Sequence, residues 1–136
     1  MSEGDKALLE LFEAACAARK QAHAPYSQFP VGAAIRTKAG KIYAGCNVEN
    51  ASYPEGWCAE TTAIGQMIIA GETEIAEVVV VAEGARLCTP CGGCRQRLSE
   101  FASMDAAIHV GSPEGLRRRF TLGELLPAAF DFGDSG

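Results

Sequence analysis

Three cysteines and one glutamate in this sequence could do chemistry together. Cys91 and Cys94 form a C-x-x-C pair directly after Pro90, and Cys58 lies two residues before Glu60. Both segments are predicted to open a helix, where free amide N–H groups and the helix dipole make it easier for a thiol to lose its proton. Three thiolates from two helix starts could therefore converge on one soft or borderline cation such as zinc.

The number of protein ligands decides what kind of zinc site these cysteines would form. A structural site takes four ligands, whereas a catalytic site takes three and leaves the fourth position to water. We interpret Cys16, Cys46 and Cys88 as small buried residues. Neither His23 nor His109 has the spacing of a metal ligand, and each is interpreted as a histidine with ordinary hydrogen bonds. The sequence therefore predicts three ligands and an open position.

Glu60 is predicted to transfer protons at this site without being a ligand. It lies at the same helix start as Cys58, which places it close to a water held by the metal. Bound zinc can lower the pKa of such a water to about 7, and a neighbouring glutamate can then carry its proton. Taken alone, Glu60 would be an ordinary first-turn glutamate favoured by the helix dipole.

The elements that position these residues follow from hydrophobic periodicity and turn residues. Buried β-branched strands that alternate with helices indicate an α/β layered fold with a mixed sheet. In the helix that begins at Cys58, Ala59, Ala63, Met67 and Ile68 are predicted to share the core face. In chain order we expect a helix over about 5–22, a strand hairpin within 31–50, a helix from 58 to 70, a strand within 77–84, a helix after 90, a strand within 105–111, a short strand within 117–120 and a helical turn over 122–126.

Length and composition bound the class of protein. The chain has 136 residues, which fits one domain over 1–136, and a net charge of −5, which argues against a nucleic-acid partner. We find no signal peptide and no apolar run of about 20 residues, so we expect a cytoplasmic protein that does not bind membranes. In that compartment the six cysteines are expected to be reduced.

Four motifs give the chain a family resemblance. "APYSQFPVGAA", "GCNVENASY", "CAE" and "PCGGCRQ" occur in the order and spacing of the small cytidine deaminases. Zinc deaminases in general combine a non-ligand glutamate, two residues after the first ligand, with a P-C-x-x-C segment. The chain therefore resembles the homotetrameric branch of this family, whose zinc is held by three cysteines.

The resemblance implies a three-layer α-β-α fold with a five-stranded mixed sheet. It implies zinc-dependent hydrolytic deamination of cytidine and deoxycytidine to the uridines, with release of ammonia, as a step of pyrimidine salvage. One Zn²⁺ per chain would be held by Cys58, Cys91 and Cys94. Glu60 would be catalytic: it would protonate the ring N3, take the proton of the attacking water and pass it to the leaving amine.

The resemblance also implies contacts to a nucleoside substrate. Asn47 and Glu49 would bind the ribose hydroxyls, and Phe29 would lie against the pyrimidine. The backbone of Ala59 would meet the ring carbonyl oxygen, and that of Thr89 the exocyclic amine. In a homotetramer with shared active sites, neighbouring subunits would close each pocket with Ala51, Tyr53 and Phe130.

Two residues depart from the family pattern. Thr61 follows the glutamate where relatives usually carry an arginine that donates to the ligand sulfurs. Its absence should raise the pKa of the zinc-bound water unless Arg95 or the amides at the helix starts compensate. Trp57, before the first ligand, could reshape the pocket or simply pack in the core.

Three other functions stay open at this point. The enzyme could deaminate another aminated heterocycle or a modified cytosine nucleoside, because Trp57 and Thr61 put the substrate in doubt. The zinc could be structural, with Cys88 or Cys46 as a fourth ligand. Cys91 and Cys94 could instead form a redox pair, although "CAE" would then have no purpose. Editing of bases in a nucleic acid is disfavoured by the acidic charge.

Overall fold

The computed structural model describes residues 1–133; residues 134–136, which end the expected polar tail, lie outside the described part. In chain order its elements are α1 (Glu3–Arg19), β1 (Val31–Thr37), β2 (Ile42–Cys46), the 3-10 helix η1 (Tyr53–Glu55), α2 (Ala59–Ile69), β3 (Ile75–Ala82), α3 (Gly92–Phe101), β4 (Ala102–Ser112), β5 (Gly115–Thr121) and α4 (Leu122–Leu125). Residues 1–133 contain no helix with the length and apolar composition of a membrane span.

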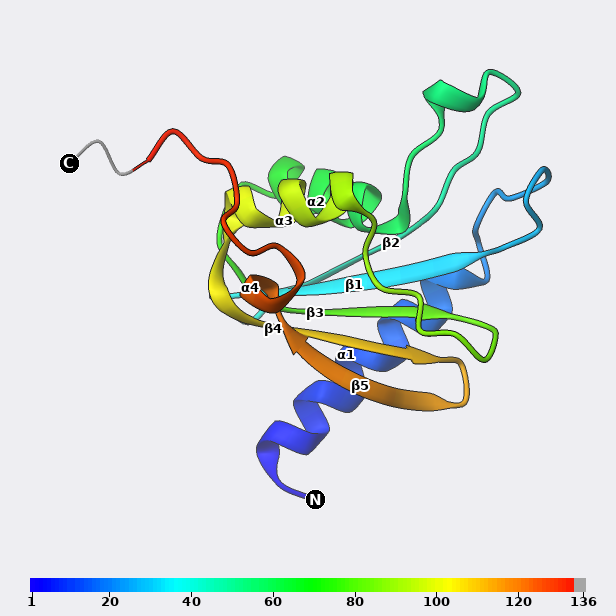
Figure 1. The fold of residues 1–136 in the computed structure, drawn as a ribbon. Helices are drawn as coiled ribbons and strands as arrows, with labels where there is room; N and C mark the ends of the chain where they lie inside the picture. The colour runs from blue at the N-terminus through cyan, green and yellow to red at the C-terminus, as the bar shows by residue number, and fades with distance from the viewer. Residues whose placement is uncertain (134–136) are drawn as a thin grey trace.

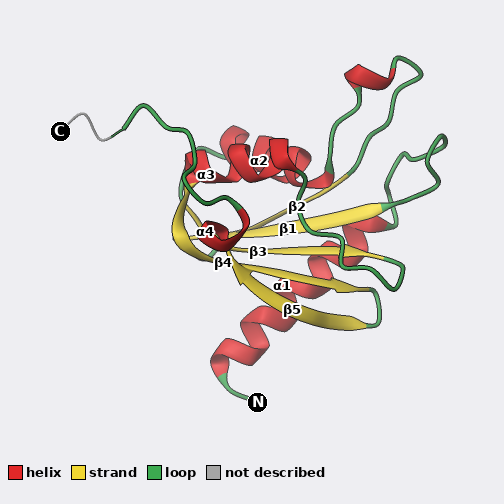
Figure 2. Ribbon diagram, in the orientation of Figure 1, coloured by secondary structure: helices red, strands yellow, loops and turns green. Residues whose placement is uncertain are grey.

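The strands form one mixed sheet of five, in the order β2-β1-β3-β4-β5. Only β3 and β4 pair in parallel, and α3 makes the crossover between them. The other three pairs are antiparallel. Helix α1 covers one face, and α2, α3 and α4 lie over the other (Figures 1 and 2). This arrangement confirms the predicted three-layer fold.

The central strand β3 feeds two cores, one on each face of the sheet. Val78 and Val80 pack in the cluster beneath α2 and α3, whereas Val79 and Val81 pack with Leu11 of α1. All four valines are fully buried because both faces are covered. Successive side chains of a strand point to opposite faces, which is why the uninterrupted valine run serves both layers.

Two glycines allow helices to approach the sheet closely. A Cβ on Gly32 would lie 2.0 Å from the carbonyl oxygen of Ala15 in α1. On the opposite face, a Cβ on Gly45 would lie 2.5 Å from the amide nitrogen of Ala63 in α2. The contact between Gly45 and Ala63 fixes the position of α2, and therefore of Cys58 at its start.

Some sequence predictions need correction. Helix α1 begins at Glu3 because Ser2 and Asp5 form a capping box, in which the Asp5 amide donates to the Ser2 hydroxyl at 3.0 Å. It ends at Arg19, earlier than expected. In α2, Ala59, Ala63 and Met67 are buried as predicted, but Ile68 is exposed and Ile64 takes its place on the core face.

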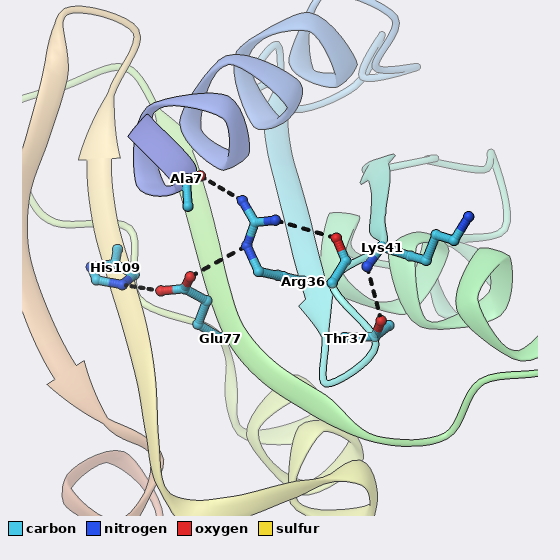
Figure 3. Close-up of polar contacts among 7 residues, drawn as sticks. Ala7, Arg36, Thr37, Lys41, Glu77 and His109 are labelled. Carbon is cyan, nitrogen blue, oxygen red and sulfur yellow. Dashed lines mark hydrogen bonds and ion pairs between the residues drawn. The ribbon is translucent and has the colours of Figure 1, made fainter. Parts of the chain in front are cut away.

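A polar network lies under α1 (Figure 3). The guanidinium of Arg36 pairs with Glu77 at 3.5 Å and also donates to the carbonyl of Ala7 at 2.5 Å. His109 donates through Nε2 to the other Glu77 oxygen at 3.0 Å. The interpretation of His109 as a histidine with ordinary hydrogen bonds is therefore confirmed.

Candidate active site

Two helix starts bring the three predicted cysteines together. Cys58 is the N-cap residue of α2 and Cys91 that of α3, while Cys94 is buried in the first turn of α3. Their sulfur atoms all lie within 4.8 Å of one another, and those of Cys58 and Cys91 are 3.6 Å apart. Sulfurs bonded tetrahedrally to zinc at about 2.3 Å would be about 3.8 Å apart. The cluster therefore fits zinc.

None of the other cysteines or histidines in residues 1–133 joins this cluster. Cys88 lines the pocket beside it, but burial raises the pKa of the Cys88 thiol to about 11 and keeps it protonated. The His109 ring belongs to the network under α1. A three-ligand set leaves the fourth position of a tetrahedral metal to a non-protein ligand, as in catalytic zinc sites.

The three cysteine thiols of the cluster lose their protons easily only when a cation is bound between them. A hydrogen bond with Cys58 and then burial raise the pKa of the Cys94 thiol far above its ordinary value. Nearby charge on Glu60 adds to the shift. Crowded thiols resist losing their protons one after another, and a divalent cation removes that resistance by binding the thiolates.

Glu60 lies in the first turn of α2 and is only 3% exposed. Burial raises the pKa of its carboxyl, against smaller effects of its own backbone N–H, of Cys94 and of Arg97. None of the ion pairs within residues 1–133 includes Glu60. A carboxyl with these surroundings can hold a proton at higher pH than usual and release it to a neighbour.

The cluster opens into a cavity of about 580 Å³, a volume suited to a small molecule. Six of the eight predicted substrate contacts line it: Phe29, Asn47, Glu49, Tyr53, Ala59 and Thr89. Ala51 and Phe130, the other two, are not among its lining residues. Phe130 is 70% exposed, and its carbonyl accepts from the Gln96 amide at 2.9 Å.

Asn47 and Glu49 follow β2 and hold the loop that carries Phe29. The Asn47 amide accepts from the Val31 N–H at 2.9 Å and donates to the Phe29 carbonyl at 3.0 Å. Glu49 accepts from the Ser27 hydroxyl and from the backbone N–H groups of Tyr26 and Ser27. The Ser27 hydroxyl, helped by the backbone N–H groups, lowers the pKa of Glu49, so the carboxylate stays ionised.

Tyr53 lines the pocket of its own chain, although the resemblance places it in a neighbouring subunit's pocket. Its ring lies edge-on to Tyr26, with the centroids 5.7 Å apart, yet Tyr53 is 75% exposed. Sequence reasoning missed Tyr26 and Ser27 as lining residues, although both lie inside the quoted motif "APYSQFP".

Trp57 is not a core residue, so its interpretation as core packing is wrong. It is 47% exposed and lines the pocket. Its indole N–H donates to the Thr62 hydroxyl at 2.7 Å, and that hydroxyl donates to the Cys46 carbonyl at 2.8 Å. Thr62 therefore fixes the tryptophan, a role that no sequence signal indicated.

Arg95 does not contact the sulfurs, although it was expected as one compensation for the missing arginine at position 61. Its three guanidinium nitrogens donate to the Pro90 carbonyl, the Leu125 carbonyl and the Thr89 hydroxyl. Arg95 thus braces the loop before Cys91 against α4.

Comparisons with known proteins agree with this geometry. Residues 5–110 match the model of the cytidine and deoxycytidylate deaminase zinc-binding region. A cytidine deaminase of Halalkalibacterium halodurans is 40% identical over 124 residues, which are 91% of this chain and 94% of that protein. A second, of Sporosarcina psychrophila, is 40% identical over 117 residues, 86% of each chain. The crystal structure of cytidine deaminase from Burkholderia pseudomallei superposes with a TM-score of 0.85 at 42% identity, covering 96% of this chain and all of that one.

Proposed function

Because the chain belongs to the cytidine and deoxycytidylate deaminase family, we propose that it hydrolyses cytidine and deoxycytidine to uridine and deoxyuridine, with release of ammonia. The observation that carries the proposal is the buried Glu60 beside three clustered cysteine sulfurs at the wall of the pocket. The match to a deaminase zinc-binding region argues against the two other functions considered, a Cys91/Cys94 redox pair and a purely structural zinc site.

Cys58, Cys91 and Cys94 would hold one zinc ion per chain. When bound, zinc supplies the Lewis acid that makes a water nucleophilic at neutral pH. The chain's own part is to place three sulfurs and one carboxyl around the reacting atoms. Gly45 and the Arg95 contacts support this placement, because they fix the starts of α2 and α3.

Glu60 would carry every proton that moves. Its carboxyl would protonate N3 of the pyrimidine, take a proton from the attacking water and deliver it to the exocyclic nitrogen, which leaves as ammonia. The raised pKa of Glu60, caused mainly by burial, supports this role, since a general acid must hold its proton near the working pH. Water in and ammonia out balance the reaction.

The pocket walls would bind the nucleoside. Phe29 would lie against the pyrimidine, and the backbones of Ala59 and Thr89 would meet the ring oxygen and the amine. The ionised Glu49 and the amide of Asn47 would bind the ribose hydroxyls. Both already hold the pocket loop through hydrogen bonds, so they are in place before substrate arrives.

We also propose that residues 1–136 form a single domain that works as a cytoplasmic homotetramer in pyrimidine salvage. Exposed aromatic side chains around the pocket support subunit contacts, because one subunit leaves them uncovered. Ala51, Tyr53 and Phe130 would then contribute to a neighbour's pocket. Tyr53 would serve its own pocket as well.

A substrate panel on the zinc-loaded protein tests the proposal. We expect turnover of cytidine and deoxycytidine, followed by the change in ultraviolet absorbance, and one zinc per chain by elemental analysis. Trp57, fixed in the pocket wall, favours a second candidate substrate, a modified cytosine nucleoside or another aminated heterocycle. If the enzyme turns over such a compound but neither cytidine nor deoxycytidine, the proposed substrate is wrong and that compound takes its place.

A further inference from the structure

Arg97 brings a positive charge to the sulfur cluster. Its Nη1 lies 3.9 Å from the sulfur of Cys94, toward which the guanidinium donates. Among the described residues no other arginine or lysine contacts a sulfur of the cluster. The hydroxyl of Thr61 lies at the same distance from Cys94, but it carries no charge.

The helix geometry of α3 places the guanidinium there. Long side chains on a helix point back toward its N-terminus, so Arg97 reaches over the turn that contains Gly93 and Cys94. A Cβ on Gly93 would lie 3.1 Å from Nη1 and 3.7 Å from Cζ of Arg97. The guanidinium therefore lies against the backbone of Gly93, so closely that a side chain at that position would push it aside by a few tenths of an ångström.

The ionic pairs of the chain leave Arg97 free for this contact. None of the salt bridges within residues 1–133 includes it. Arg95, its neighbour on α3, gives its donors to two carbonyls and a hydroxyl. Among the cationic side chains of residues 1–133, Arg97 is thus the one that contacts a sulfur of the cluster and can offset its charge.

Three thiolates around a divalent cation sum to a charge of −1, which a nearby guanidinium offsets. We propose that Arg97 is a positioning residue that stabilises the zinc-loaded cluster by donating to Cys94, and that Gly93 provides the space for it. The inference rests on the proposed function, because it requires the three cysteines to hold zinc. Partners of metal ligands typically change metal affinity 10- to 100-fold, and the exposure of Arg97 puts its effect near ~10-fold.

The first test compares zinc affinity, measured by competition with a chromophoric chelator, in wild type, Arg97→Gln and Arg97→Lys. We expect Arg97→Gln to bind zinc about 10-fold more weakly and Arg97→Lys to recover part of the loss. Arg119→Gln removes another exposed positive charge, on the edge strand β5 away from the sulfur cluster, and should match wild type. Equal affinity of Arg97→Gln and wild type would overturn the inference and leave the proposed function standing.

A wild type that takes up no zinc would overturn the proposed function and this inference together. Both Arg97 and Gly93 are exposed, so their variants should fold, and thermal unfolding of each zinc-loaded variant checks this.

The second test moves the guanidinium without removing it. Gly93→Ala adds a Cβ 3.1 Å from Nη1 of Arg97, which must shift by a few tenths of an ångström, at a helical position where alanine is otherwise favourable. We expect it to weaken zinc binding in the wild-type background and to have no effect in the Arg97→Gln background, because the two changes act through one group. The same loss in both backgrounds would show that Gly93 acts without Arg97 and would overturn its part of the proposal.

Discussion

A carboxylate lies on each side of the sheet, the half-buried Glu77 on β3 and the buried Glu60 on α2, and the two have different surroundings. On the α1 face, Glu77 lies between the guanidinium of Arg36 and the imidazole of His109, each within 3.5 Å (Figure 3). On the opposite face, Glu60 has the sulfur cluster as its neighbour and takes part in no ion pair of residues 1–133.

The comparison shows that the surroundings of a glutamate decide whether it stabilises the fold or can transfer protons. Contacts from Arg36 and His109 to both carboxylate oxygens of Glu77 join β1, β3 and β4 beneath α1. Burial raises the pKa of Glu60 despite the smaller opposing effect of Arg97, which leaves its proton available for transfer. The carboxylate on the α1 side of the sheet therefore stabilises the fold, whereas the carboxyl on the α2 side is suited to proton transfer.

The largest expected effect is that of Glu60→Gln. The variant should keep its zinc and its thermal stability but lose at least ~10²-fold in kcat, since it can no longer carry protons. Steady-state kinetics together with zinc analysis check this. Glu77→Gln is the matched change on the other face and should keep kcat within about twofold. Loss of kcat in Glu77→Gln of similar size would break the comparison between the two carboxylates.

Substituting Gly32 and Gly45, the two glycines that pack closely against α1 and α2, tests the two sides of the sheet separately. Gly32→Ala would push against α1 and Gly45→Ala against α2, so each should lower the free energy of unfolding by about 3 kcal/mol. Only Gly45→Ala should also weaken zinc binding, because it displaces the helix that begins beside Cys58. Denaturant unfolding and chelator competition measure the two effects. Equal zinc affinity in both variants would contradict the assignment of chemistry to the α2 face.

Glu77→Gln should also be less stable than wild type, by about 1–3 kcal/mol, because Arg36 and His109 lose a charged partner. Denaturant titration at pH 7 gives the value. Glu83→Gln removes the exposed carboxylate that pairs with Arg19 at 3.5 Å, so it serves as the control and should change stability by less than about 1 kcal/mol. A control as damaging as Glu77→Gln would remove the special role of the buried network.

The smallest expected effect concerns Glu49, a pocket carboxylate whose pKa is lowered. Ser27→Ala removes the hydrogen bond that lowers it most, so the pKa of Glu49 should rise toward its ordinary value of 4.5. A lowered pKa stabilises the folded state above that value and the stabilisation is lost as pH falls, so wild type and variant should converge in acid. A carbon-detected NMR titration of the Glu49 carboxyl follows the shift, and an unchanged pKa would refute the role of Ser27.

Much of the fold and the centre of the site could be predicted because their signals are local in sequence. The valine run of β3 and the hairpin of β1 and β2 indicated the sheet. The "CAE" and "PCGGC" segments indicated two helix starts with sulfur ligands. Family membership and the three-layer fold are confirmed, whereas the roles of Glu60 and of the substrate contacts stay predictions.

The interactions that sequence reasoning missed all join segments that are distant along the chain or follow from the turn of a helix. Trp57 bonds to Thr62 and not to the core, Ile68 gives way to Ile64, and Arg97 reaches the sulfur cluster that Arg95 was expected to serve. Each depends on side-chain direction, which spacing alone does not give.

The sequence by itself determined which atoms are available: three thiols, one carboxyl and the helices and strands that carry them, because residue type and local periodicity depend only on neighbours in the chain. The tertiary structure alone decided which of these atoms meet and how their charges are balanced. It buried Glu60 beside the sulfur cluster, paired Glu77 with Arg36 and His109, and turned Arg97 back onto Cys94. Burial and distance set the electrostatics, and both arise only when the helices pack on the sheet.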